Sequence, residues 1–160
     1  MKLFLNSNQG KILSYHVQIE GFHKLLTVCY DKVIEKTIYV INTLYGSFYK
    51  YYDTGPRTYY FNTKPNKELY RFDPEYFYKA GTQEIFLKHI LGKNKSQLIY
   101  ETTFISRGHL APDKDFVLLS WQQVTYFYLN AIPQWHSINA GNWNILENFI
   151  RNFAKKTKLD

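Results

Sequence analysis

The feature that most constrains this chain is a helical pattern near its carboxyl end. In residues 142–156, apolar side chains recur at spacings of three and four: Trp143, Leu146, Ile150 and Phe153. This spacing predicts an amphipathic helix with one buried apolar stripe. Lys155, Lys156 and Lys158 follow, and cations are favoured at the carboxyl end of a helix.

Two strand-like runs precede this helix. Residues 97–105 and 125–132 are rich in aromatic and β-branched side chains, and Pro133 closes the second run. Residues 113–123 between them suit a short helix, because Phe116 and Leu119 fall at helical spacing. The carboxyl-terminal half is therefore predicted to place two strands before a long helix.

The amino-terminal half reads mainly as sheet. Residues 25–30 and 37–43 are rich in aromatic and β-branched residues, and the charged stretch 31–36 suits the connection between them. The 15 Tyr and 12 Phe of the chain add to this preference, since aromatic side chains pack well on pleated surfaces. Together the two halves predict an α+β fold with an antiparallel sheet flanked by helices.

Composition narrows the class of protein. The chain has 160 residues, of which 45% are hydrophobic, which is enough for one domain with a real core. A net charge of +7 with many aromatic rings suits a polyanionic partner, because cations attract phosphate and rings stack on bases. Solubility alone is the other explanation of this charge.

The sequence shows no recognisable targeting segment. Cys29 is the single cysteine, so an intrachain disulfide is excluded, and its strand-like surroundings suit a small buried side chain. The first residues contain only a three-residue apolar run, which is too short for a signal peptide. No stretch of the sequence reaches the length of about 20 apolar residues that a transmembrane helix needs.

Polar side chains with catalytic chemistry surround the second strand-like run. His109 lies before it, and Asn139, Glu147 and Arg151 follow at separations of multiples of four, so they drift by only about 40° per four residues around a helix. A neutral histidine can accept a proton from water, and an asparagine oxygen suits Mg²⁺. Arginines neutralise charge on phosphate. These groups fit phosphodiester hydrolysis.

Three segments carry a specific resemblance: Ser106-Arg-Gly-His-Leu-Ala-Pro-Asp113, Tyr126-Phe-Tyr-Leu-Asn-Ala-Ile-Pro-Gln134 and Asn139-Ala-Gly-Asn-Trp-Asn-Ile-Leu-Glu147. Together they resemble the DNA/RNA non-specific endonuclease family, whose members share the ββα-metal (His-Me) finger. The residues of these segments are most similar to those of arthropod secreted nucleases that degrade double-stranded nucleic acid. The amino-terminal half matches more loosely, through residues 28–31, residues 37–44 and Arg57.

The resemblance implies a role for each matching residue. His109 would be the general base that activates water. Asn139 would be the direct protein ligand of one Mg²⁺, for which Mn²⁺ could substitute, and Glu147 would orient the water around the metal. Asn130 would support the site from the second strand. Three arginines would contact or stabilise phosphate: Arg57, Arg107 and Arg151.

The chain departs from the family pattern at two places. Ser106 stands where the motif often begins with Asp, which removes a carboxylate from the vicinity of the metal. Family members continue beyond the metal helix with further strands and helices, whereas this sequence stops at Asp160. We therefore expect one nuclease domain over residues 1–160, truncated after the metal helix, with a ββα-metal core at about residues 97–156.

Two functions follow from the resemblance. The first is a Mg²⁺-dependent, sugar-non-specific endonuclease that acts on DNA and RNA, mainly double-stranded. The second is a truncated, catalytically inactive relative that binds nucleic acid without cutting it. By resemblance the protein would be extracellular. An unrelated structural β-rich protein would require the match between Arg107 and Arg151 to be accidental.

Overall fold

The computed structural model describes residues 11–18, 22–51, 60–64, 67–92 and 103–159. Within these ranges the chain folds into two small antiparallel sheets, one long carboxyl-terminal helix and several shorter helices and 3-10 turns. The strands are β1 (Lys11–Gln18), β2 (Phe22–Asp31), β3 (Lys36–Ile41), β4 (Ile105–His109) and β5 (Ala131–Trp135). The helices are α1 (Ala80–Leu91), α2 (Leu119–Gln122), α3 (His136–Ile138) and α4 (Asn144–Thr157).

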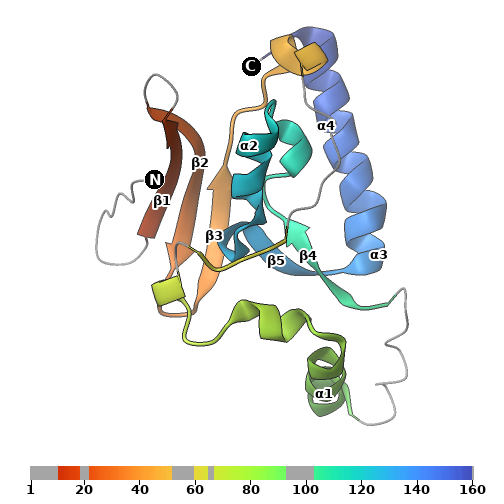
Figure 1. Ribbon diagram of the computed structural model, residues 1–160. Coiled ribbons are helices and arrows are strands. Elements are labelled where there is room, and N and C mark those ends of the chain that lie inside the picture. The colour runs from red at the N-terminus through yellow and green to blue at the C-terminus, as the bar shows by residue number, and fades with distance from the viewer. Residues whose placement is uncertain (1–10, 19–21, 52–59, 65–66, 93–102, 160) are drawn as a thin grey trace.

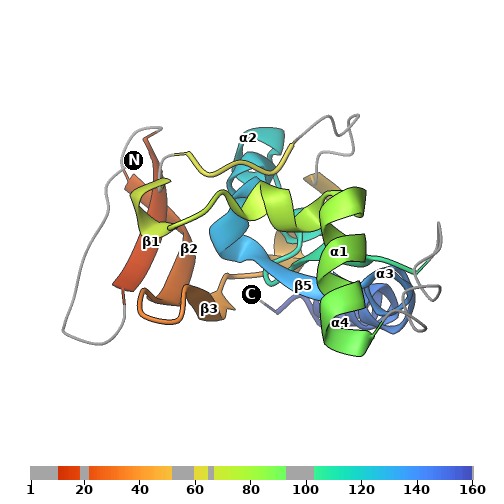
Figure 2. The same cartoon turned by 90° about the horizontal axis from the view of Figure 1, so that it is seen from below.

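The two sheets have different places in the molecule. The three-stranded sheet has the order β1-β2-β3, and β4 pairs separately with β5. Both Figure 1 and Figure 2 place the three-stranded sheet at one end and helices α1, α3 and α4 at the other, with β5 between them. The predicted mixed α+β architecture is confirmed, but the described strands form two small sheets instead of one.

The hairpin of β2 and β3 agrees with its sequence. Its register pairs Val28 with Val40, and the four residues between the strands form a turn. The Asp31 side chain accepts a hydrogen bond from the backbone N–H of Val33 at 2.8 Å, as expected for an aspartate that begins a turn. The predicted antiparallel pair is thus confirmed, with β2 at the centre of the sheet and β3 beside it.

The core lies where β2 meets the segments that carry the second sheet. Its buried side chains come from distant parts of the sequence: Leu25, Leu26, Val28, Tyr30, Leu69, Ala111, Phe116 and Leu129. Two hydrogen bonds join the same parts. Thr37 Oγ1 donates to the Leu129 carbonyl at 2.7 Å, and the Tyr30 hydroxyl donates to the Leu69 carbonyl at 3.2 Å. The amino-terminal sheet therefore supports the segment that precedes β5.

The strand predicted at residues 125–132 is displaced. Residues Gln123–Tyr126 and Tyr128–Asn130 form 3-10 turns, and the strand is Ala131–Trp135, with Pro133 inside it. The backbone bonds from Leu110 to Asn130 and from His136 to Phe104 place Pro133 at a non-hydrogen-bonded position. Its missing N–H points away from β4, so the proline is tolerated there. The prediction that Pro133 ends the strand was wrong.

The helix predicted at residues 113–123 is also interrupted. A 3-10 turn, Asp113–Asp115, is separated from α2 by extended backbone at Phe116 and Leu118. Both Asp115 and Phe116 are buried, so the chain follows their packing and not the helical spacing. Tertiary contacts override a local pattern of this strength.

Helix α4 is present where predicted, but its buried face is different. The buried residues are Arg151 and Ala154, whereas Leu146, Ile150 and Phe153 are 45%, 48% and 53% exposed. The predicted burial of the apolar stripe was therefore wrong in this structure. The rotation of α4 is set by the polar contacts of Arg151 and by the close packing of Gly46 against the Ala154 carbonyl.

Candidate active site

Strand β4 carries the first two candidate residues. Arg107 and His109 are two residues apart, so their side chains project from the same face of the strand. They pair with Pro133 and Ala131 of β5. Between them, a Cβ at Gly108 would collide with Gln134 Oε1, so the Gln134 side chain would have to shift. The short sheet thus presents both side chains on one surface.

Asn130 holds the chain just after His109. Its Nδ2 donates to the carbonyls of Ala111 and Thr125 at 2.8 and 2.9 Å, and its Oδ1 accepts from the Ala111 N–H at 2.9 Å. The side chain is buried, and both ends of its amide are used. Asn130 therefore fixes the exit of β4 and acts on the site through the backbone.

The imidazole of His109 lies among aromatic rings. Phe61 and Tyr126 each have ring centroids 4.9 Å from it. The Tyr126 hydroxyl donates to Asp113 Oδ2 at 2.7 Å, so one of the two rings beside His109 is also bonded to a carboxylate. These contacts restrict the orientation of the His109 ring.

Arg107 lies against a second group of rings. Its Nε donates to the Tyr128 hydroxyl at 3.0 Å, and its guanidinium carbon lies 4.8 Å from the Tyr78 ring centroid and 5.8 Å from that of Phe61. A guanidinium over aromatic faces is held by cation–π attraction. The planar group is therefore positioned before any anion binds.

A polar cavity of about 230 Å³ brings several candidates together. Its lining comes from the end of β4, the turn after it, and the two sides of the α3–α4 junction: His109, Pro112, Asp113, Asn139, Ala140, Asn144 and Glu147. Since liquid water occupies about 30 Å³ per molecule, the space holds several waters or a hydrated cation. Sequence reasoning predicted His109, Asn139 and Glu147 but did not single out Asp113 and Asn144.

The junction between Asn139 and Glu147 is not one straight helix. After α3, residues Asn139–Trp143 form a π-helical turn, and Gly141 has non-helical backbone angles (φ −97°, ψ −109°) before α4 begins. The simple spacing of four residues therefore does not relate Asn139 to Glu147. They line the same cavity because of the kink, which bends the chain around it.

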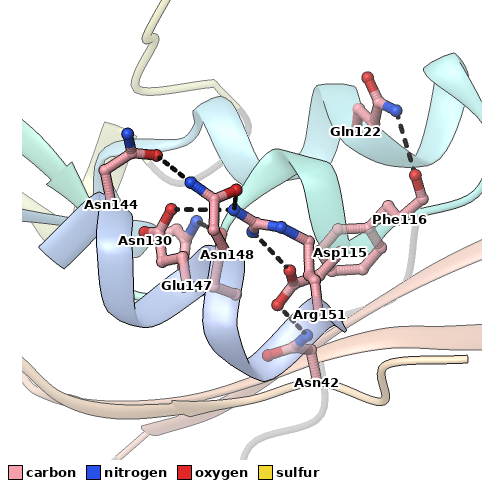
Figure 3. A network of polar contacts seen from close by, with 10 residues as sticks. Asn42, Asp115, Phe116, Gln122, Asn130, Asn144, Glu147, Asn148 and Arg151 are labelled. Carbon is pink, nitrogen blue, oxygen red and sulfur yellow. Dashed lines mark hydrogen bonds and ion pairs between the residues drawn. The ribbon is translucent and has the colours of Figure 1, made fainter. Parts of the chain in front are cut away.

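Arg151 lies in the interior, outside the lining of this cavity. Its guanidinium donates to Asp115 Oδ1 and Asn148 Oδ1, each at 3.0 Å, and lies 3.6 Å from the Glu147 carboxylate. Figure 3 shows this network, which continues from Asp115 to Asn42. In this arrangement Arg151 lies next to Glu147, and the role that the resemblance implied, contacting or stabilising phosphate, stays a prediction.

Burial changes the acidity of both carboxylates in the network. It raises the pKa of Asp115 above its ordinary value of 3.8, and the hydrogen bond and charge of Arg151 oppose that rise. Burial likewise raises the pKa of Glu147 above 4.5, again opposed by Arg151. Arg151 thus favours the charged form of the carboxylate that faces the cavity.

The oxygen atoms around the cavity fit a hard divalent cation. Asn139 supplies an amide oxygen, and Asp113 and Glu147 supply carboxylates, which are the donor types that Mg²⁺ prefers while keeping several waters. No group of three or more His, Cys, Asp and Glu side chains suited to a metal occurs among the described residues. One amide oxygen and two carboxylates suit a cation that keeps several of its waters.

Three further residues differ in how the sequence and the structure describe them. Arg57 lies outside the described residues. The contact of the Phe61 ring with His109 was not predicted, because nothing in an aromatic run indicates which ring faces the site. Asp115 was not among the predicted site residues, since its partner Arg151 is 36 positions away.

A comparison with known protein families identifies the family of this chain. The model of the family described as DNA/RNA non-specific endonuclease matches residues 6–160. The chain belongs to this family. The resemblance inferred from the motif segments is thereby confirmed, and nucleases of the DNA/RNA non-specific endonuclease family are generally metal-dependent.

Three curated relatives are salivary proteins of insects. A salivary endonuclease of Lutzomyia longipalpis is 32% identical over 140 residues, which are 88% of this chain and 33% of the relative. A salivary endonuclease of Culex quinquefasciatus is 43% identical over 56 residues, 34% of this chain and 15% of the relative. The salivary protein Tsal1 of Glossina morsitans morsitans is 25% identical over 127 residues, 79% of this chain and 31% of the relative.

These matches cover only part of each relative. The chain spans at most about a third of the length of these relatives. Among the described residues, no helix is both long and apolar enough to cross a membrane.

Proposed function

We propose that this chain carries the catalytic site of a Mg²⁺-dependent, sugar-non-specific endonuclease that hydrolyses phosphodiester bonds in DNA and RNA. Family membership supports the nuclease class. The observation that carries the site assignment is the polar cavity shared by His109, Asn139 and Glu147. Mn²⁺ could replace Mg²⁺, because both prefer oxygen ligands.

In this proposal His109 is the general base. Its imidazole takes a proton from the attacking water, which histidine can do near neutral pH. The contacts with Phe61 and Tyr126 hold the ring in one orientation. Asn130 fixes the backbone that follows it. Together they keep the base at the edge of the cavity.

The remaining polar residues would orient the phosphate and the cation. Asn139 would be the direct protein ligand, and Glu147, with Asp113 nearby, would orient water around the metal. A bound Mg²⁺ would supply electrostatic stabilisation of the charge that develops on phosphate. Arg107 would contact the phosphate directly, and Arg57 would do the same from the amino-terminal half. Arg151 would act through Glu147.

We further propose that residues 1–160 form a single nuclease domain with a ββα-metal core at about residues 97–156. The order of β4, β5 and the α3–α4 unit around the cavity supports this arrangement. Double-stranded DNA and RNA would be the substrates. The salivary origin of the relatives supports secretion and an extracellular site of action.

The test is digestion of plasmid DNA and of double-stranded RNA by the purified chain. We expect cleavage of both substrates with Mg²⁺, arrest by EDTA, and loss of cleavage in His109→Ala. His89→Ala is the matched control, since His89 is exposed on α1 and lies outside the cavity. Undiminished digestion by His109→Ala would overturn the assigned base.

The interior position of Arg151 favours a second candidate function. This guanidinium is paired to Asp115 and lies outside the lining of the polar cavity, where it would not contact a phosphate directly. The chain would then be a catalytically inactive relative that binds nucleic acid in a salt-dependent manner without cutting it. Metal-dependent nicking of a supercoiled plasmid would exclude this alternative.

A further inference from the structure

A second, larger cavity is lined by β5 and by Tyr78 and Tyr128, the two rings that lie against Arg107. Its volume is about 890 Å³, within the usual range for small-molecule sites. Its walls come from the turn between β2 and β3, residues 70–78, the start of α1 and the β5 residues 131–133. The catalytic proposal uses none of this space.

Aromatic side chains dominate the lining. Tyr30 and Tyr128 are buried, whereas Phe72 and Tyr76 are 83% and 63% exposed. The Tyr30 hydroxyl is already bonded to the Leu69 carbonyl, so mainly its ring is offered to a ligand. Such a cavity presents flat apolar faces, suited to a flat, largely uncharged ligand.

The acidic groups of the lining have partners of their own. Glu35 forms an ion pair with Arg71 at 2.7 Å. Asp73 caps the 3-10 turn Pro74–Tyr78 by accepting from the Glu75 N–H at 3.0 Å. These contacts leave the aromatic faces as the main recognition surface. The lining also contains the cation Lys36, so a metal ion is a poor occupant.

The cavity is continuous with the arginine of the candidate active site. Tyr78 and Tyr128 line it, with ring centroids 5.9 Å apart, and the same two rings lie against the guanidinium of Arg107. Pro133, another lining residue, pairs with Arg107 across the sheet. A phosphate held by Arg107 would have its attached nucleoside close to these rings.

We propose that this cavity, which we call the aromatic cavity, binds an unstacked nucleobase of the strand whose phosphate contacts Arg107. The inference rests on the proposed nuclease function and names a substrate subsite for it. Every nucleobase has an aromatic face, so stacking there is independent of sequence. The subsite would thus position the strand without restricting which sequence is cut.

The experiment compares a fluorescein-labelled single-stranded oligonucleotide with an abasic analogue of the same length and charge. Binding is measured by fluorescence anisotropy in EDTA, so the result does not depend on cleavage. Because stacking on aromatic side chains favours each bound base substantially, we expect the base-containing strand to bind about tenfold more tightly.

The variant that tests the cavity is Phe72→Ala/Tyr76→Ala. Both side chains are mostly exposed, so their loss leaves the core intact. We expect the variant to bind both strands with the affinity of wild type for the abasic strand. Phe72→Tyr/Tyr76→Phe should restore the preference. Phe149→Ala, which removes an exposed ring on α4 outside the cavity, should keep it.

Several outcomes would overturn the subsite. These are equal affinity of wild type for the two strands, no measurable binding of either strand, a preference that survives in the double variant, or its loss in Phe149→Ala. This test and the test of the nuclease proposal can fail independently. Equal binding of the two strands would contradict the subsite but not the role of His109 in cleavage. Cleavage by His109→Ala would contradict the assigned base but not the preference for base-containing strands.

Discussion

Arg151 Nη1 lies 3.0 Å from Asp115 Oδ1, and both side chains are buried. This ion pair joins α4 to the 3-10 turn Asp113–Asp115, which follows β4 in the sequence. The same guanidinium reaches Asn148 and lies near Glu147. Arg151, which was predicted as a site residue, therefore holds α4 against the turn that contains Asp115.

Replacing Arg151 by methionine should destabilise the fold strongly. Arg151→Met keeps the apolar stem but leaves Asp115 buried without its cationic partner, which costs roughly 3–5 kcal/mol. Chemical denaturation measures the change. Arg71→Met is the control, because the Arg71–Glu35 pair is exposed on the arginine side and should contribute about 1 kcal/mol or less. Equal losses in the two variants would contradict a structural role for the buried pair.

Gly46 should not tolerate a side chain. A Cβ there would collide with the carbonyl oxygens of Ala154 and Leu159 at the end of α4, and the Gly46 N–H donates to Leu159 at 3.0 Å. Gly46→Ala should therefore lower the thermal midpoint by several degrees, since overpacking costs about 1–3 kcal/mol. Gly81→Ala in α1, where a Cβ meets nothing, should leave the midpoint unchanged or raise it. An unaffected Gly46→Ala midpoint would mean that α4 does not dock here.

Arg107→Lys should impair cleavage although it keeps the charge. Lysine cannot reproduce the planar contact with Tyr78 or the Nε bond to Tyr128. Loss of a positioned charged hydrogen bond corresponds to roughly a 10- to 100-fold lower kcat/KM. Steady-state digestion of a defined duplex measures it, with Arg71→Lys as the exposed control. Wild-type rates in Arg107→Lys would remove Arg107 from the site.

Tyr30 should make the stability depend on alkaline pH. Burial and the nearby Glu35 and Asp31 raise the pKa of Tyr30 from 10.0 to about 12. The neutral phenol therefore stabilises the folded state fully below pH 10, and this contribution is lost as the pH rises toward 12. Near pH 8 we expect Tyr30→Phe to be less stable by about 1 kcal/mol, through loss of the bond to Leu69.

The difference between wild type and Tyr30→Phe should then close by about pH 11, where linkage removes on the order of 1 kcal/mol from the wild-type protein. Denaturant titrations at the two pH values measure the gap. Tyr60→Phe, at an exposed ring, controls for the loss of one tyrosine. A gap that stays constant over this range would contradict the raised pKa.

Local patterns predicted the β2–β3 hairpin and helix α4 well, because alternation and helical spacing depend on neighbouring residues. They failed for residues 123–130, where the buried Asn130 and Tyr128 are held by contacts with distant segments. They also failed for the buried face of α4. The apolar stripe of Leu146, Ile150 and Phe153 predicts that this face of α4 is buried. In this structure the pairing of Arg151 with Asp115 turns a different face toward the core.

The family, the α+β class and the candidates His109, Asn139 and Glu147 could be predicted from the sequence, since motif residues and their order can be read without coordinates. Which of these side chains lie together depends on contacts between distant segments. The kink at Gly141 brings Asn139 and Glu147 to the cavity of His109, and the ion pair with Asp115 withdraws Arg151 from it. Both outcomes depend on partners far apart in the sequence, and helical spacing holds only within one unbroken helix.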